Sequence, residues 1–128
     1  MKTYLRTAVI AAAMLASATV ASAVSLNAFD PDKDGSIDLR EAQAAGRAAF
    51  AKMDPDKDGT LDKKELGARL SGKALKASDP DKDGTIDAKE YASAIAARFK
   101  AADPDNDGTI DAKELKTKAG RALLRLIK

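Results

Sequence analysis

DPDKDGSIDLRE, at residues 30–41, is the first of four copies of one twelve-residue segment. The other copies occupy residues 54–65, 79–90 and 103–114, and we call the four segments loops 1 to 4 in chain order. Each copy has Asp at positions 1, 3, 5 and 9, Pro at position 2, Gly at position 6, Ser or Thr at position 7 and Glu at position 12. Four complete copies in register predict one local structure that the chain builds four times.

The four loops contain every acidic residue of the chain, because five carboxylates in each account for all 20 Asp and Glu. On an ordinary solvated surface, both signs of charge are scattered along the helices. Confinement of all the acidic residues to the loops therefore argues against the interpretation that these are merely polar, exposed loops. The pattern is that of the EF-hand loop, in which oxygen ligands wrap a hard cation. The sequence therefore predicts four metal sites.

The predicted ligands stand at positions 1, 3, 5, 7, 9 and 12 of each loop. Position 7 supplies its backbone carbonyl, position 9 coordinates directly or through water, and the Glu at position 12 binds through both oxygens. The predicted metal-ligating residues are Asp30, Asp32, Asp34, Ser36, Asp38, Glu41, Asp54, Asp56, Asp58, Thr60, Asp62, Glu65, Asp79, Asp81, Asp83, Thr85, Asp87, Glu90, Asp103, Asp105, Asp107, Thr109, Asp111 and Glu114.

Several function classes find no support in the composition. The chain has no Cys and no His, so it offers no thiolate or imidazole ligand and lacks the usual general base. All its carboxylates lie in the loops, which leaves none for catalysis, and we expect no enzyme. The basic residues outside the loops balance the acidic excess within them, so we expect no nucleic-acid partner.

Residues 1–23 have the pattern of a cleaved secretory signal peptide. Lys2 and Arg6 precede an uncharged apolar run over residues 7–20, and Ala21-Ser22-Ala23 forms a small-x-small cleavage site. A membrane anchor is the alternative, but the run falls short of the ~20 residues that span a bilayer. We therefore expect one metal-binding domain at residues 24–128, located in the periplasm of a Gram-negative source and without a membrane partner after cleavage.

The spacing of the loops predicts the architecture. Loops begin at residues 30, 54, 79 and 103, which leaves only 12 or 13 residues between one loop and the next. One helix must therefore serve as the exit of one loop and the entrance of the next, and it spans about 20 Å. We predict an all-α fold, a compact three-helix bundle of fused EF-hands whose four metal loops share short helices.

Up-and-down connection would place loops 1 and 3 at one end of the bundle and loops 2 and 4 at the other. The residues at position 8, Ile37, Leu61, Ile86 and Ile110, would then pair neighbouring loops through short extended segments. Gly67 and Gly72 weaken the helical pattern of the middle segment, residues 66–78.

Apolar residues at helical spacing predict the core. They recur at Leu39, Ala42, Ala45, Ala49, Phe50 and Met53, at Tyr91, Ala94, Ile95 and Phe99, and at Leu115, Ala119, Ala122, Leu123, Leu126 and Ile127. A ligand groove along these stripes is the alternative. A sensor that opens a Met-rich groove is disfavoured, because residues 24–128 contain a single Met and short helices. We expect a monomer.

Five carboxylates in one loop repel one another strongly when no metal is bound, and a cation of high charge offsets that repulsion best. A trivalent lanthanide of about the size of calcium fits, whereas Mg²⁺ is smaller and demands strict octahedral geometry. Up to four lanthanide(III) ions are expected, with Ca²⁺ as the weaker alternative, and an exported calcium buffer is the competing function. The four prolines, all at position 2, either stiffen the turn or preorganise the first Asp, and the two readings are compatible.

Loops of the form D-P-D-[KN]-D-G-[ST]-[IL]-D-x-[KR]-E, spaced 24 to 25 residues apart behind a signal peptide, resemble the lanmodulin family of periplasmic lanthanide-binding proteins. The resemblance implies a compact three-helix fold, tight and selective lanthanide binding, and ordering of a loose chain when metal binds. It also implies a role in lanthanide uptake or trafficking, with uptake machinery or a lanthanide-dependent dehydrogenase as partner. The fourth loop of the family departs from the pattern at position 1, whereas Asp103 keeps it here, so a fourth competent site is predicted.

Overall fold

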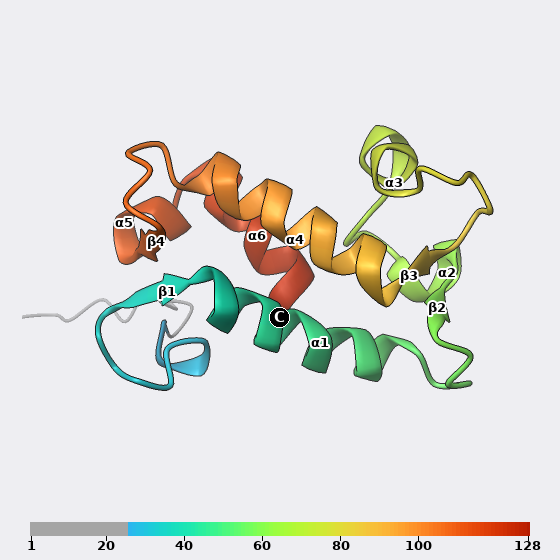
Figure 1. The fold of residues 1–128 in the computed structure, drawn as a ribbon, viewed down its shortest axis with the longest axis horizontal. Coiled ribbons are helices and arrows are strands. Elements are labelled where there is room, and N and C mark those ends of the chain that lie inside the picture. Colours follow the sequence, from blue (N-terminus) through green and yellow to red (C-terminus); the bar gives the residue numbers. More distant parts are fainter. Residues whose placement is uncertain (1–25) are drawn as a thin grey trace, which may run out of the picture.

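The computed structural model describes residues 26–128, so the predicted signal peptide at residues 1–23 lies outside the described residues. The described chain is mostly helical, with two small pairs of antiparallel strands (Figure 1). Its elements are the 3-10 helix η1 (Leu26–Ala28), β1 (Ser36–Asp38), α1 (Leu39–Met53), β2 (Thr60–Leu61), α2 (Lys63–Leu66), α3 (Gly72–Ser78), β3 (Ile86–Asp87), α4 (Ala88–Ala102), β4 (Thr109–Asp111), α5 (Ala112–Leu115) and α6 (Lys118–Ile127). Within this part of the chain, every helix is too short or too polar to cross a bilayer.

Two of the three connections between loops are single shared helices, as predicted. Helix α1 leaves loop 1 and enters loop 2, and α4 leaves loop 3 and enters loop 4; each is 15 residues long. Each begins where the Asp at position 9 caps its first turn and ends at the first Asp of the next loop. The loop sequence therefore sets both the start and the end of these helices.

The middle connection is not one helix. Helix α2 has four residues, and α3 begins only at Gly72. Gly67 and Gly72 adopt positive φ values of 54° and 56°, which turn the chain between the two helices. The prediction of one shared helix between loops 2 and 3 is wrong here, because the two glycines, which already weakened the helical pattern in the sequence, turn the chain between two short helices.

This break decides which loops lie together. Strand β1 of loop 1 pairs with β4 of loop 4, and β2 of loop 2 pairs with β3 of loop 3. The predicted placement of loops 1 and 3 at one end, and of 2 and 4 at the other, is therefore wrong. Loops 2 and 3 therefore stay at one end, where β2 pairs with β3, and α4 brings the chain back so that loop 4 lies beside loop 1 (Figure 1).

Residues at position 8 do pair, as predicted, although between different loops. Ile37 lies opposite Ile110, and Leu61 lies opposite Ile86, and all four are fully buried. The expectation of an all-α fold needs correction on this point, because β-bridges join the loops. The six α-helices of residues 26–128 also exceed the three of the predicted bundle.

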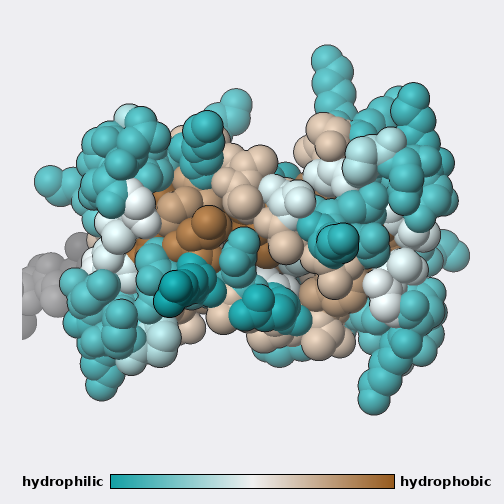
Figure 2. All heavy atoms as spheres, viewed as in Figure 1, coloured by the Kyte–Doolittle hydropathy of each residue, from teal (hydrophilic) through white to brown (hydrophobic). Residues whose placement is uncertain are grey.

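Helices α1, α4 and α6 pack against one another and enclose the core between the two pairs of loops. In the space-filling view, hydrophilic residues gather at both ends of the molecule and apolar residues show through in the middle (Figure 2). The segment after loop 4 divides into α5 and α6, because the side chain of Thr117 caps a new helix by accepting from Gly120 N–H. The apolar stripe predicted for it is nevertheless buried at Leu115, Leu123 and Leu126.

Candidate metal centre

The Asp at position 1 is held by the backbone of its own loop. In loop 1, Oδ1 of Asp30 accepts from Asp34 N–H at 3.2 Å, and Oδ2 accepts from Gly35 N–H at 3.0 Å. The same two bonds recur in loops 2, 3 and 4. Asp30 is only 2 % exposed although it is charged. Its side chain is therefore fixed in orientation at the base of the loop.

Position 5 is held in a tighter turn. Oδ1 of Asp34 accepts from the N–H of Ser36 at 2.9 Å and from its hydroxyl at 2.8 Å. Thr at position 7 makes the same pair of bonds in the other loops. The presence of Ser or Thr at position 7 of all four loops therefore has a local explanation, because the hydroxyl group orients the carboxylate two residues earlier.

Position 4 carries a conformational role that sequence reasoning missed. Lys33, Lys57, Lys82 and Asn106 have φ values between 55° and 59°, in the left-handed region, and the Gly at position 6 follows with φ between 83° and 87°. Asn is among the side chains that tolerate this region best, so Asn106 was the available signal. The two turns curl each loop around its own carboxylates.

Positions 9 and 12 form a capping box. Oδ1 of Asp38 accepts from Glu41 N–H at 2.8 Å, and Glu41 Oε2 accepts from Asp38 N–H at 2.9 Å. All four loops show this reciprocal pair at the start of the following helix. The spacing Asp-x-x-Glu is the usual sequence signal for such a cap, whereas the sequence-based prediction for both residues was metal binding alone.

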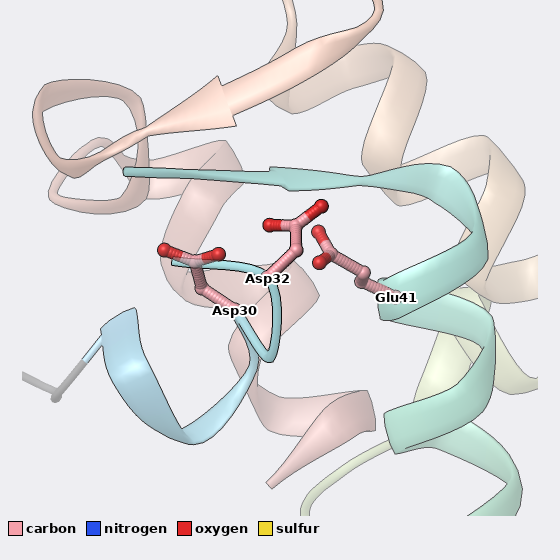
Figure 3. Close-up of side chains that lie close together, drawn as sticks. All are labelled: Asp30, Asp32 and Glu41. Carbon is pink, nitrogen blue, oxygen red and sulfur yellow. The ribbon is translucent and has the colours of Figure 1, made fainter. Parts of the chain in front are cut away.

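Three carboxylates converge in each loop, from positions 1, 3 and 12. In loop 1, oxygens of Asp30, Asp32 and Glu41 lie within 4.8 Å of one another, with Glu41 reaching toward Asp32 and Asp30 on the other side of Asp32 (Figure 3). The equivalent groups are Asp54, Asp56 and Glu65, then Asp79, Asp81 and Glu90, and then Asp103, Asp105 and Glu114. Two oxygens bound to one calcium-sized ion at about 2.4 Å are at most about 4.8 Å apart, so the spacing suits such an ion.

The structure thus brings together half of the predicted ligand positions. Positions 5 and 9 lie outside the converging groups, and their carboxylates are engaged with backbone N–H groups of the turn and the helix cap. Assignment of the carbonyl at position 7 as a ligand stays a prediction. In each loop, the carboxylates at positions 1, 3 and 12 converge, and those at positions 5 and 9 stabilise the loop backbone through hydrogen bonds.

The electrostatics of loop 1 show what the crowded carboxylates do without a cation. The hydrogen bond with Asp30 raises the pKa of Asp32, and the charge on Asp34 adds to that shift. Burial raises the pKa of Glu41, helped by the nearby charges of Asp32 and Asp38. Burial also acts to raise the pKa of Asp30, but hydrogen bonds from Gly35 and other groups outweigh it and hold that pKa below the ordinary value. Two of the three converging carboxyl groups of loop 1 therefore have a raised pKa when no cation is present.

One buried side-chain oxygen of loop 1 has no hydrogen-bond partner. Oε1 of Glu41 is buried and accepts no hydrogen bond, and it is the single such side-chain atom recorded within residues 26–128. A buried carboxylate oxygen without a donor is costly, and a bound cation removes that cost. The second oxygen of Glu41 belongs to the capping box, so Oε1 is free to turn toward a metal ion. The donor set of loop 1 therefore fits a hard cation.

Three segments of the chain match the family model described as EF hand, at residues 23–43, 47–71 and 95–117. Together they cover more than half of the chain and include loops 1, 2 and 4. The chain is also similar to lanmodulin of Methylorubrum extorquens, with 62 % identity over 64 residues. That match covers 50 % of this chain and 48 % of the relative, so it spans about half the length of each protein.

Proposed function

The chain belongs to the EF-hand family, and from that premise we propose that it binds trivalent lanthanide ions selectively, one in each of its four loops. It is a metal-binding protein and not an enzyme. The observation that carries the proposal is the convergence of three carboxylates in every loop, within a loop that holds five. The likeness to lanmodulin supports the same choice of ion.

The charge of the loops favours a trivalent ion over Ca²⁺. Coulomb attraction grows in proportion to the charge of the ion at nearly unchanged distance, so each carboxylate gains half as much again from a 3+ ion as from a 2+ ion. Loop 4 is the most anionic, with five carboxylates and one basic residue, Lys113. Calcium binds the same oxygens with less energy, and an exported calcium buffer is the second candidate function because EF-hand loops cover a wide range of calcium affinities.

We further propose that metal binding folds the chain. Each loop places its position 8 residue in the core, and Ile37 and Ile110 are fully buried against each other. Carboxylates that repel one another push the loop open when no metal is bound, and this would withdraw the same residue from the core. A bound ion closes the loop and restores it. The loaded form is then a compact, monomeric bundle built on α1, α4 and α6.

The cellular role that we propose is lanthanide uptake or trafficking in the periplasm. The signal-peptide pattern at residues 1–23 and the resemblance to the lanmodulin family support it. The partners would be uptake machinery or a lanthanide-dependent dehydrogenase that receives the ion. The mature protein would be residues 24–128.

A chelator-buffered titration of residues 24–128 tests the choice of ion. We expect four equivalents of La³⁺ to raise the helix content measured by circular dichroism in the presence of a large excess of Ca²⁺. Tyr91 follows Glu90 of loop 3 directly, so excitation of this tyrosine should sensitise Tb³⁺ bound there. If Ca²⁺ folds the protein at micromolar concentration and La³⁺ does no better, the lanthanide proposal is wrong and the calcium buffer takes its place.

Single replacements at position 12 provide the matched variants for the number of sites. Gln in place of Glu41 or Glu114 keeps a side chain that can complete the capping box while removing the ligand's charge. Each variant should therefore lose one equivalent of bound metal and retain the helix that follows. Four equivalents in both variants would contradict the assignment of position 12 as a ligand.

A further inference from the structure

Helix α6 has two faces of opposite character. Lys118, Arg121 and Arg125 are exposed, and at 3.6 residues per turn they fall within about one-sixth of the helix circumference. Leu123 and Leu126, on the other side, are fully buried in the core. Since the core already covers the apolar face, the part of α6 that meets the solvent is its basic face.

The positive charge continues beyond the end of α6. Arg69, Arg125 and Lys128 line a hollow beside Ala68. The guanidinium of Arg69 donates to the backbone carbonyls of Arg125 and Lys128, which ties it to the end of α6. Residues 112–128 contain one acidic residue and six basic residues, which are Lys113, Lys116, Lys118, Arg121, Arg125 and Lys128. We call Lys118, Arg121, Arg125 and Lys128, together with Arg69, the basic face.

The start of the basic face adjoins loop 4. Gly120 in the first turn of α6 packs against the backbone oxygen of Glu114, and loop 1 lies beside loop 4 through the β1–β4 pair. Loop 1 has five acidic and two basic residues, and loop 4 has five and one, so the two carry a formal charge of −7. Two trivalent ions reduce that charge to −1. Metal therefore removes most of the negative charge adjacent to α6.

We propose that the basic face docks on the anionic headgroups of a phospholipid bilayer, and that loading the loops with trivalent metal strengthens the attachment. The second part rests on the proposed function. Residues 26–128 hold 20 basic and 20 acidic residues and are formally neutral without metal, because the other two basic residues of the chain are Lys2 and Arg6. Electrostatic interactions act over a Debye length of about 8 Å at physiological salt, so loops 1 and 4 have the largest effect on α6.

A bilayer suits this surface better than nucleic acid does. A membrane surface requires no matching shape, and clustered Lys and Arg side chains attach to anionic lipid by charge alone. Single-stranded nucleic acid is bound through exposed aromatic rings, whereas Tyr91 is 2 % exposed and Phe99 is 6 % exposed. Attachment does not need a spanning helix, and so it is compatible with the short, polar helices of residues 26–128. The proposal differs from the expectation of no membrane partner, which considered only whether residues 7–20 are long enough to span a bilayer.

Sedimentation of residues 24–128 with phosphatidylcholine vesicles, with and without phosphatidylglycerol, tests the proposal. The basic-face variant replaces three exposed side chains by Gln: Lys118, Arg121 and Arg125. The control variant removes the same charge from exposed positions of α1 and α3: Lys52, Lys73 and Lys76. Each basic side chain at an anionic surface raises the affinity for the membrane roughly fivefold. The basic-face variant should therefore bind the vesicles about 100-fold more weakly than the parent, whereas the control variant should lose much less affinity.

The arms of the experiment separate the possible explanations. We expect binding that needs phosphatidylglycerol, weakens with salt and strengthens when four equivalents of La³⁺ are bound. Equal losses in the two variants would overturn the proposal, because net charge and not the basic face would then be responsible. Binding of the loaded basic-face variant as tightly as the parent would also overturn it, because metal ions would then bridge protein and lipid. Tighter binding to duplex DNA than to the vesicles would overturn the choice of partner.

A separate measurement keeps this test apart from the proposed function. Metal occupancy is read from Tb³⁺ luminescence without lipid, so a failure to bind lanthanide is seen independently of the vesicles. Filled sites without vesicle binding would overturn the docking proposal and leave the proposed function intact. Empty sites with vesicle binding through the basic face would overturn the proposed function and the metal dependence, and would support the docking face itself.

Discussion

Replacing Gly120 with alanine should force α6 away from the backbone that follows loop 4. A Cβ atom at this position would lie 2.1 Å from the backbone oxygen of Glu114 and 2.5 Å from Leu115 Cα. Favourable contacts between heavy atoms begin at about 3.5 Å, so the two segments must separate by at least about 1 Å. Both of these atoms belong to the backbone and cannot rotate away as the end of a side chain could.

Two effects of opposite sign determine the size of the change. Alanine is favoured over glycine inside a helix by about 1 kcal/mol. Overpacking costs about 1–3 kcal/mol, and rigid backbone atoms place this case at the upper end. We therefore expect a net loss of about 1–2 kcal/mol in the free energy of unfolding, which lowers the melting temperature by about 5–15 °C in a domain of this size. Loop 4 should bind metal more weakly as well, because the displaced Glu114 is its position 12 residue.

Thermal unfolding of the La³⁺-loaded protein, followed by circular dichroism, measures the loss, and a metal titration measures the effect on loop 4. Gly46→Ala is the matched control, because Gly46 also lies in a helix but the new Cβ would meet Ile95 Cδ1 at 2.0 Å. That atom is the mobile end of a side chain, so the control should lose less stability. If Gly120→Ala raised the melting temperature and still bound four ions, helix propensity would prevail and the described contact between α6 and loop 4 would be incorrect.

Three further outcomes are expected. Tyr91→Phe removes the hydrogen bond that the phenol donates to the carbonyl of Leu126, so it should lower the free energy of unfolding by about 1–3 kcal/mol in chemical denaturation. In the parent protein, burial raises the pKa of Tyr91 to about 12, and an absorbance titration should show this. Gly67→Ala places a side chain at φ 54° and ψ −130°, a region that only glycine adopts readily, and should cost about 1–3 kcal/mol in the same denaturation assay. The apparent metal affinity of loop 1 should begin to fall, on acidification, at a higher pH than in a loop of ordinary carboxyl groups, because the pKa values of Asp32 and Glu41 are raised in the metal-free protein and protons compete with the ion. Tb³⁺ luminescence in chelator-buffered titrations at several pH values, on a variant lacking the other sites, would show this. Acid should have the opposite effect on the stability of the metal-free protein. Because the pKa of Glu41 is raised in the folded state, this group stabilises the fold at low pH, and that stabilisation is lost as the pH rises through the pKa of folded Glu41.

The sequence predicted the local structure well because each loop encodes its own geometry. Position 1 finds backbone N–H donors four and five residues later, as Asp30 does with Asp34 and Gly35, and such bonds depend only on nearby residues. The shared helices α1 and α4 followed from the short spacing between loops. Loop pairing could not be obtained in this way, because it depends on where the chain reverses. Gly67 and Gly72 are unfavourable for a helix, but their positive φ values, and hence the turn of the chain between α2 and α3, are a property of the folded chain.

The same limit explains what was missed within the sites. The sequence pattern predicts that the Asp at position 9 and the Glu at position 12 bind metal. Their spacing also matches a capping box. The spacing alone cannot decide between two roles that one residue can fill at the same time. Glu41 has one oxygen for each role, since Oε2 completes the cap and Oε1 is left without a partner. The contribution of Arg69 to the basic face likewise could not be predicted, because it comes from a segment more than 40 residues earlier than α6.

The position of the loops relative to the core explains why metal affinity and folding should be one quantity in this protein. Four fully buried residues, Ile37, Leu61, Ile86 and Ile110, belong to the loops themselves, and they meet in pairs across the two short sheets. If metal binding folds the chain as proposed, each ion would stabilise two loops, its own directly and the paired loop through the bridge. Part of the binding energy would then be used to close the loop and bury the position 8 residue. It follows that the first ion bound at either end lowers the cost of closing the second loop at that end, so filling should proceed by pairs, loops 1 and 4 together and loops 2 and 3 together.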